Sequence, residues 1–165
     1  MNLQRWFRHM ATGRWQVNRA FPPSRLQAIE QAIREGEAVH GGEVRFAVEG
    51  ALDHAALRAG LSPAQRALDV FSLLRIWDTH DRNGVLVYVL LADHAVEIIA
   101  DRGIHARVGN DGWEAICQQM EAGFRAGDPE TAVTAGIRAV NALLQQHFPD
   151  SEARPNELPD VAVVL

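Results

Sequence analysis

A long uninterrupted run of apolar residues, Val85–Ala92, is the feature that most constrains the fold of this chain. It is rich in valine and leucine and has the length of a strand, well short of the roughly 18–20 apolar residues that cross a membrane. A strand without polar alternation is covered on both faces and lies inside a sheet. A short turn at Asp93-His94 leads to a second run, Ala95–Ala100, so the two runs predict an antiparallel hairpin.

The residues before the hairpin predict two helices with a strand between them. The first helix, between residues 24 and 40, follows a proline pair and carries apolar residues at helical spacing: Leu26, Ile29 and Ile33. Glu43–Glu49 alternates polar with apolar residues, which predicts a half-exposed strand. Ser62-Pro63 is an N-cap followed by proline at the first helical position, and the helix that it starts is expected to direct one apolar side to the core: Ala67, Leu68, Phe71, Leu74 and Trp77.

Two amphipathic helices are expected after the hairpin, separated by Gly127-Asp128-Pro129, where the aspartate caps the second helix. Their apolar faces are Trp113, Ile116, Cys117, Met120 and Phe124 in the first, and Val133, Ile137, Val140, Leu144 and Phe148 in the second. Helices on both sides of a buried hairpin predict an α/β fold, a three-layer α/β/α sandwich in which helices flank a small mixed β-sheet.

The charges divide the chain into unlike parts. All 16 basic residues are arginine, and the first acidic residue is Glu30, so residues 1–29 carry five arginines and no acid. We expect residues 1–20 to form a basic, aromatic N-terminal arm or helix, 21–148 the α/β domain, and 149–165 an irregular tail that lies loosely over the surface. A length of 165 residues suits a single domain with one core.

Composition excludes several classes of protein. Because the remainder of the chain sets 21 acidic residues against eleven arginines, it repels a phosphate backbone, and no nucleic-acid partner is expected. A single cysteine, Cys117, allows neither an internal disulfide nor a cysteine-rich zinc site. No transmembrane segment and no secretory signal are found, which favours a cytoplasmic location, with the basic arm leaving peripheral attachment to a membrane open.

Common catalytic signatures fail when each is tested against the sequence. The phosphate-binding loop, the nucleophile elbow, the zinc-protease helix and the dinucleotide glycine motif do not occur. A cysteine-dependent phosphatase needs an arginine six residues after its nucleophile, and the residue six beyond Cys117 is Gly123. No two histidines stand at the i, i+3 or i+4 spacing of a helical metal pair, so each is predicted to be a surface or turn residue: His9, His40, His54, His80, His94, His105 and His147.

Aspartates at the two sequence ends of the hairpin form a candidate metal site. The start of the first strand and the end of the second lie at one edge of an antiparallel pair, so four carboxylates could converge there: Asp78, Asp81, Asp101 and Asp111. Hard oxygen ligands suit calcium or magnesium. In the alternative interpretation Asp101 pairs with Arg102 or another arginine, and Asp111 or Asn110 caps the helix that follows.

The segment from Ile76 to Ile104 resembles the TPM-domain family, which is named partly for a thylakoid-lumen phosphatase-like protein of photosystem II repair. The shared features are the Asn83–Leu86 turn into an apolar strand, a second strand with an acid near its middle, and a glycine after it. The chain is most similar to a short proteobacterial branch, through Gly42–Phe46, Trp77–Thr79 and Asp101–Gly103. The resemblance covers roughly residues 21–148 and implies an α/β/α sandwich, divalent-ion binding, and the acid phosphatase activity assigned to plant relatives.

Two functional hypotheses follow. In the first, the chain is a binding or assembly module for a protein or membrane-complex partner, and the arm supplies the contact surface: Trp6, Phe7 and Trp15 with Arg5, Arg8 and Arg14. In the second, it is an acid phosphatase-like phosphomonoesterase that uses calcium or magnesium held by the aspartates to polarise phosphate and activate water. The absence of a nucleophile motif favours the first.

Overall fold

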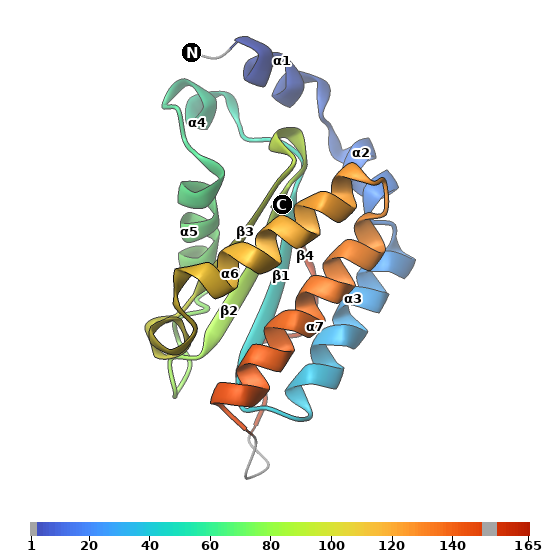
Figure 1. Cartoon of the computed structure of the whole chain (residues 1–165). Helices are drawn as coiled ribbons and strands as arrows, with labels where there is room; N and C mark the ends of the chain where they lie inside the picture. Colours follow the sequence, from blue (N-terminus) through green and yellow to red (C-terminus); the bar gives the residue numbers. More distant parts are fainter. Residues whose placement is uncertain (1–2, 150–154) are drawn as a thin grey trace.

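A computed structural model describes residues 3–149 and 155–165 of the chain (Figure 1). The helices are α1 (Leu3–Ala11), α2 (Arg14–Ala20), α3 (Pro23–Glu37), α4 (His54–Arg58), α5 (Pro63–Leu73), α6 (Arg102–Arg125) and α7 (Pro129–His147). The strands are β1 (Glu43–Glu49), β2 (Gly84–Leu90), β3 (Ala95–Ala100) and β4 (Val163–Val164), and a short 3-10 helix, η1 (Leu91–Asp93), joins β2 to β3.

The strands form one mixed sheet in the order β3-β2-β1-β4. β2 and β3 are antiparallel, with Val85 opposite Ala100 and Leu90 opposite Ala95, so the predicted hairpin is confirmed. β1 runs parallel to β2, and β4 runs parallel to β1 on the other side. His94 ends η1 with a φ of 53°, a left-handed conformation that closes the turn.

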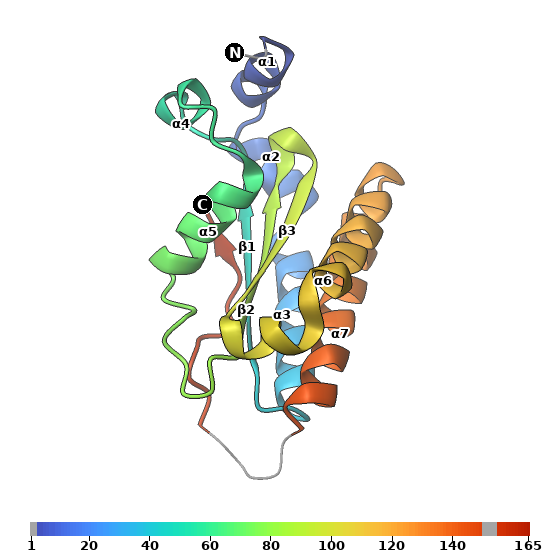
Figure 2. The same cartoon turned by 60° about the vertical axis from the view of Figure 1, so that its left-hand side comes forward.

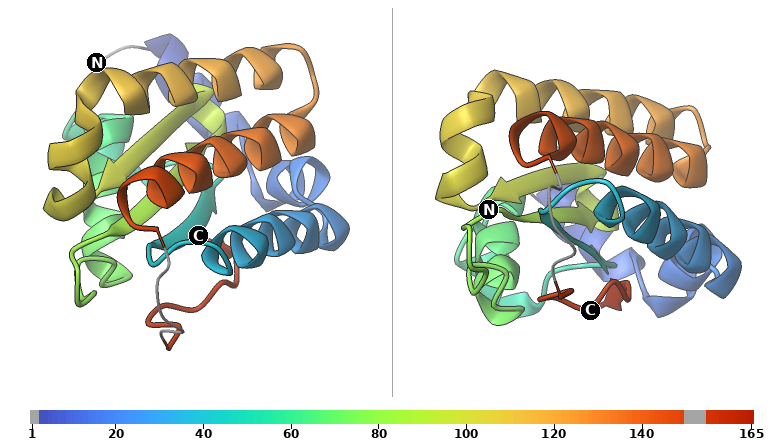
Figure 3. Two further views of the ribbon diagram at one scale, coloured as in Figure 1. Left: turned by 60° about the horizontal axis from the view of Figure 1, so that its bottom comes forward. Right: turned by 90° about the horizontal axis from the view of Figure 1, so that it is seen from below.

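Helices cover both faces of the sheet, as the predicted α/β sandwich requires (Figures 2 and 3). One face packs on α3, α6 and α7 through alternate valines of β1 and β2 and through Phe46. The opposite face packs on α4 and α5 through Ala47, Leu86, Tyr88 and Leu90. Two separate apolar clusters therefore lie on the two sides of β1 and β2.

β1 is buried along its whole length, so the predicted half-exposed strand is wrong. Its polar positions face other parts of the protein. Glu49 accepts hydrogen bonds from Tyr88 Oη at 2.6 Å and from Arg66 Nε at 2.8 Å. Charged residues at alternate positions of a strand indicate that one face is polar. They do not show that this face is exposed, because other protein groups can bind the charged side chains in place of water.

Helix boundaries are confirmed in part. α5 starts at the predicted Ser62 cap, which accepts a hydrogen bond from Gln65 N, but it ends at Leu73. Leu68 and Trp77, which were expected in the core, are 54% and 50% exposed. The capping role predicted for Asp128 is confirmed, because its side chain accepts a hydrogen bond from Thr131 N.

The C-terminal segment is not loose where it is described. Its last residues form β4 against β1, and Leu158 is buried in the cluster beneath α5. Glu43 accepts hydrogen bonds from Glu157 N at 3.1 Å and Leu158 N at 3.0 Å. Residues 155–162 are irregular, as expected, but these contacts attach residues 155–165 to the sheet, while residues 150–154 lie outside the described part of the chain.

The N-terminal arm forms two helices, and α1 packs against η1. Asp93 on η1 accepts hydrogen bonds from Nε and Nη2 of Arg5, with Nη2 2.8 Å from Oδ2, and its Oδ1 lies 3.1 Å from Nε2 of His9. His9 Nδ1 also accepts a hydrogen bond from Leu52 N at 3.0 Å. Charge on the arm is thus used to attach α1 to the turn of the hairpin.

Candidate functional site

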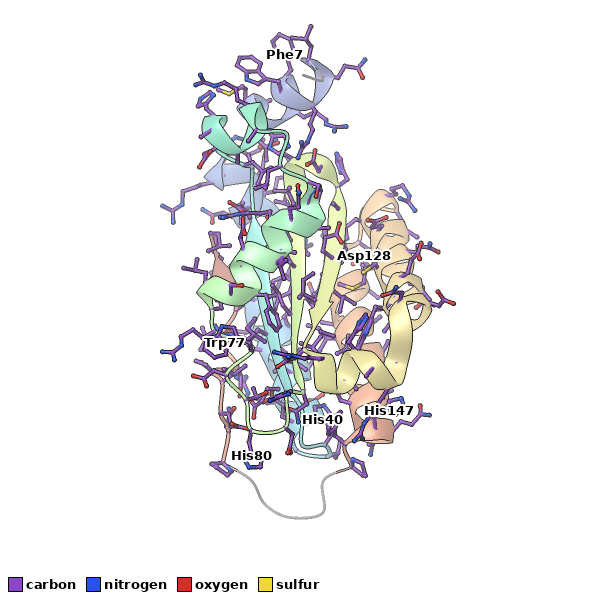
Figure 4. All side chains as sticks on the ribbon, turned by 90° about the vertical axis from the view of Figure 1, so that its left-hand side faces the viewer. Phe7, His40, Trp77, His80, Asp128 and His147 are labelled. Carbon is purple, nitrogen blue, oxygen red and sulfur yellow. The ribbon has the colours of Figure 1, made fainter. Side chains whose placement is uncertain are left out.

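The loop before β2 and the start of α6 form a pocket of about 340 Å³ at the base of the hairpin, lined by Trp77, Asp78, Thr79, Arg82, Asp101 and Arg102. We call it the hairpin-base pocket. Trp77 and His80 mark this loop in Figure 4, at the end of the molecule opposite Phe7. The antiparallel pairing of β2 with β3 brings the two segments together, as the sequence predicted.

Backbone contacts hold the two sides of this pocket close to each other. Gly103 N donates a hydrogen bond to Arg82 O at 3.0 Å. A Cβ atom at Gly103 would lie 2.5 Å from that oxygen and 2.6 Å from Asp81 O, so only glycine fits here. On the other side of the loop, buried Asn83 donates from Nδ2 to Gly41 O at 2.6 Å. The loop is therefore fixed from both sides.

The four predicted aspartates are not equivalent. Asp101 is 9% exposed and caps α6, where it accepts a hydrogen bond from Arg102 N at 2.6 Å. Asp78 lines the same pocket but is exposed and pairs with Arg75 at 3.0 Å. Asp81 contributes backbone to this region, and its Oδ1 lies 3.0 Å from His80 Nδ1. Asp111 is exposed on α6, past a break in the helix at Gly109.

A metal ion needs several converging ligands. Within residues 3–149 and 155–165, no three histidine, cysteine or acidic side chains gather in a position to hold one. The structure brings Asp78 and Asp101 to one pocket and leaves Asp111 out of its lining. These two carboxylates do not by themselves make a complete cation site.

The pocket has a cationic side that was not predicted from the sequence. Arg82 and Arg102 both line it, next to Asp81 and Asp101 in the sequence. Arg82 has a φ of 53°, which is uncommon for a residue other than glycine. Guanidinium groups bind phosphate and carboxylate oxygens with two hydrogen bonds. The sequence does indicate these arginines, because each of them directly follows one of the aspartates predicted to bind a metal ion.

Two of the histidines predicted to be surface or turn residues are buried, and one of them, His40, lies in the connection between α3 and β1. His9 is 3% exposed and His40 is 2% exposed. His40 Nδ1 accepts a hydrogen bond from Gly42 N, and its Nε2 lies 3.1 Å from Asn141 Oδ1. Both rings thus connect distant segments of the fold. The hydrogen-bond partners of His9 and His40 lie far away in the sequence. The spacing of the histidines along the chain therefore could not indicate that these two are buried.

A second group of charged residues lies where β1 begins. We call Glu37, Glu43 and Asp160 the carboxyl cluster. Burial, with the nearby charges of Glu43 and Asp160, raises the pKa of Glu37 to about 9, although Glu37 Oε1 accepts a hydrogen bond from Val44 N at 2.9 Å. Burial likewise raises the pKa of Glu43. Arg45, 7% exposed, is the neighbouring cation, and its Nε and Nη1 have no hydrogen-bond partner among the described residues.

Fold and pocket together define a small α/β sandwich in which a charged loop and a helix start meet at the base of a hairpin. The sequence profile of the TPM domain matches residues 18–143, most of the chain, and the protein belongs to this family. The resemblance found in the sequence is thereby confirmed at the level of the family. No curated protein matches the chain.

Two solved structures share the fold. The BA42 protein from the psychrophilic bacterium Bizionia argentinensis is 29% identical, with a TM-score of 0.75 over 86% of this chain and 92% of that one. The N-terminal domain of a protein from P. gingivalis is 19% identical, with a TM-score of 0.53 over 78% of this chain and 76% of the other. The second likeness concerns the fold alone.

Proposed function

We propose that the protein is a binding module that attaches to an anionic membrane surface through α1 and α2, where it contacts a membrane complex. One observation carries the proposal: large apolar side chains on helices that contain arginine and no acid are exposed. Leu3, Phe7 and Met10, spaced along one side of α1, are 62%, 63% and 48% exposed, and Trp15 on α2 is 61% exposed. We call these four residues the N-terminal apolar face.

The attachment of α1 to the hairpin supports this role. Arg5 and His9 on one side of α1 bind Asp93, and Trp6 is half-buried, so the opposite side is held toward the surroundings. Figure 4 shows Phe7 at the far end of the molecule, pointing away from the sheet. Helices with aromatic residues on one side and arginine nearby bind in the headgroup region of anionic bilayers.

The contact surface that we propose differs in part from the residues expected from the sequence. Phe7, Trp15 and Arg14 of the predicted contact set are exposed. Arg5 and Arg8 pair with Asp93, at 2.8 Å and 3.3 Å. Leu3 and Met10 take the place of Trp6, which packs beside His54 with ring centroids 6.4 Å apart. Within residues 3–149 and 155–165, no helix combines the length and the apolar composition of a membrane span.

Vesicle sedimentation tests the proposal on the full chain. The wild type is expected to sediment with phosphatidylcholine vesicles that contain phosphatidylglycerol, and less with phosphatidylcholine alone, because basic residues near the surface add affinity for anionic lipid. Replacing both Phe7→Gln and Trp15→Gln should weaken binding by about tenfold or more, given roughly 1.5–3 kcal/mol for burying one large apolar side chain.

The matched control is Leu73→Gln, which removes an apolar side chain 67% exposed on α5, away from this surface. Its binding should equal that of the wild type. If the double variant sediments as well as the wild type, the N-terminal apolar face is not the binding surface. If the wild type sediments with neither kind of vesicle, attachment to lipid is excluded.

A second function, a metal-assisted phosphomonoesterase, is proposed for the hairpin-base pocket. Its support is the presence of two carboxylates and two arginines in one pocket of about 340 Å³, since Arg82 and Arg102 suit a phosphate group. Asp78 and Asp101 would supply two of the ligands of a calcium or magnesium ion, and the ion would supply charge for phosphate and an activated water. Asp111 does not line the pocket and is therefore the weakest of the four predicted ligands.

Thermal denaturation with calcium or magnesium chloride tests this second function, because a ligand bound by the native state raises its Tm. Asp101→Asn keeps a capping residue for α6 but removes the negative charge, so calcium or magnesium should no longer raise the Tm of this variant. Asp111→Asn should leave the increase unchanged. The enzyme hypothesis is rejected if neither salt raises the Tm of the wild type and p-nitrophenyl phosphate is not hydrolysed.

A further inference from the structure

A groove of about 490 Å³ runs between β3 and α6, and neither proposed function uses it. β3 is the edge strand of the sheet, so the groove opens along that edge. Its volume lies in the range of about 300–1,000 Å³ that is usual for ligand sites. We call it the edge groove, and the residues that matter are Glu97, Ile98, Trp113, Glu114, Cys117 and Glu121.

The edge groove is acidic. Glu97, Glu114 and Glu121 line it, and of the described residues around it none is an arginine, while His105 is the one that can gain a positive charge. Burial, and then the charge of Glu121, raises the pKa of Glu97. Arg125 lies 4.0 Å from Glu121 and is mostly exposed, so it neutralises this carboxylate weakly. The groove therefore favours a ligand that carries positive charge.

Its floor does not accept an added strand. Val96 N donates a hydrogen bond to Glu121 Oε1 at 3.3 Å, and Ile98 N hydrogen-bonds the thiol of Cys117. Two of the N–H groups of β3 that face away from β2 are thus already used by side chains of α6. Burial raises the pKa of Cys117 to about 12, which keeps the thiol protonated and unreactive. A ligand in the edge groove must therefore bind the side chains that line it and not the backbone of β3.

A buried donor in the groove lacks an acceptor. Trp113 is 4% exposed, and its Nε1 has no hydrogen-bond partner within the described parts of the chain. An indole N–H can only donate, and a buried donor left unsatisfied is unfavourable. A carbonyl oxygen brought into the groove would satisfy it. The unpaired N–H of Trp113 is an observation independent of the three glutamates. It indicates that the ligand carries an acceptor oxygen in addition to its positive charge.

We propose that the edge groove binds the basic side chain of a peptide, with the cation held by Glu97 and Glu121 and a peptide carbonyl accepting from Trp113 Nε1. A guanidinium fits two neighbouring carboxylates through its planar array of donors. A free amino acid is disfavoured, because its own carboxylate would face the three glutamates. A metal ion lacks the ligands, since no suitable group of three is present among the described residues.

Nuclear magnetic resonance of the full-length, ¹⁵N-labelled protein tests the proposal with acetyl-Ala-Arg-Ala-amide as the probe. The indole signal of Trp113 is identified by its loss in Trp113→Phe. The peptide is expected to move that signal downfield with saturation. Glu97→Gln and Glu121→Gln should each weaken binding by about tenfold, as expected for loss of one charge-assisted hydrogen bond. Asp69→Asn, which removes an exposed acid on α5, should not change the Kd.

Three results would overturn the proposal. The first is equal binding of the same peptide with citrulline in place of arginine, because citrulline has no charge. The second is binding of free L-arginine as tightly as the blocked peptide, which would assign the groove to a free amino acid. The third is a titration in which the Trp113 indole signal does not move. None of these outcomes depends on lipid binding by the N-terminal apolar face or on chemistry at the hairpin-base pocket.

Discussion

Asp93 is the residue that joins the N-terminal helices to the hairpin. Its side chain is 8% exposed, and Arg5 and His9 both reach it. Burial opposes its ionisation, but the hydrogen bonds from Arg5 and His9 outweigh burial, so the pKa of Asp93 is lowered. A carboxylate with a lowered pKa stabilises the folded state where it is ionised, and that contribution is lost on acidification.

Asp93→Asn should therefore destabilise the protein by about 2–3 kcal/mol near neutral pH, since Arg5 and Arg8 lose their charge pair with Asp93. The stabilisation by Asp93 is fully present above its unfolded pKa of about 3.9 and disappears as the pH falls through its lower folded value. Urea denaturation of both proteins should show a difference that shrinks toward zero in acid. A difference that is independent of pH would mean that the charge of Asp93 does not matter.

Glu37 has the opposite dependence on pH. Its pKa is raised to about 9 by burial and neighbouring carboxyl groups, so the folded protein holds a proton there that the unfolded chain releases above its ordinary value of 4.5. The contribution of this proton to the free energy of unfolding is complete below the unfolded pKa of 4.5, and it decreases as the pH rises toward about 9. The decrease is at most about 1.4 kcal/mol for each pH unit.

Glu37→Gln should remove this decrease while keeping an oxygen that accepts the hydrogen bond from Val44 N. The variant is expected to gain stability relative to the wild type as the pH rises from about 5 to 9. Denaturation curves over that range measure the trend. Glu35→Gln, an exposed position on the same helix, is the control and should follow the wild type. Parallel curves for wild type and Glu37→Gln would show that Glu37 ionises normally.

At the scale of the elements, the contact between α3 and α7 depends on a glycine. A Cβ atom at Gly36 would lie 2.1 Å from the side chain of Asn141. That side chain is buried, donates from Nδ2 to Ala32 O at 3.0 Å, and lies beside His40. Asn141 thus connects α7, α3 and the turn before β1, and the two helices can approach it only where α3 has no side chain.

Gly36→Ala should destabilise the protein by about 1–3 kcal/mol, because overpacking displaces a hydrogen-bonded side chain. Helix propensity alone favours alanine by about 1 kcal/mol, so the sign of the effect separates packing from propensity. Thermal and urea denaturation measure it. Gln27→Ala, at an exposed position of α3, controls for propensity and should be close to neutral. A stabilised Gly36→Ala variant would show that α3 and α7 move apart easily.

At the scale of the whole molecule, the C-terminal segment completes the sheet. Residues 155–165 place β4 on the outer side of β1, and Leu165 N donates to Val48 O at 2.9 Å. Glu30 and Glu43 bind backbone N–H groups of the same segment. Its removal would leave β1 with an open edge and Glu43 buried without these donors, and open edges promote association between chains.

A chain ending at Pro149 should therefore lose about 2 kcal/mol or more of stability and associate at concentrations where the full chain does not. Urea denaturation and light scattering after size exclusion measure the two effects. Val161→Ala in the full chain, at a position 60% exposed in the same segment, should change neither. An equally stable and monomeric truncated chain would show that β4 contributes nothing to the fold.

Sequence patterns were sufficient where the signal is local. The hairpin from Val85 to Ala100 was correct because an unbroken aliphatic run, a turn and a second run leave few alternatives. The caps at Ser62 and Asp128 were correct because capping involves residues three apart. β4 was missed because two valines give no periodicity, and its partner β1 lies more than a hundred residues away in the sequence.

The candidate sites show the same limit. Asp101 and its neighbour Arg102 could be selected from sequence, and the pocket that they line with Asp78 follows from the predicted hairpin. The acidic groove along β3 could not be predicted in this way. A groove is made by the angle at which α6 crosses the edge strand, and α6 changes direction at Gly109, with a φ of 75°.

The amino-acid sequence by itself determined the fold class, the hairpin and the family, because these follow from apolar periodicity and local turns. Only the tertiary structure decided which charges face water and which face each other. Glu43 and Asp93 would be expected at the surface from the sequence, but both carboxylates are buried in the fold. Backbone N–H groups bind Glu43, and arginine and histidine side chains bind Asp93. The free energy of a charge depends on its surroundings, and distant parts of the chain supply them.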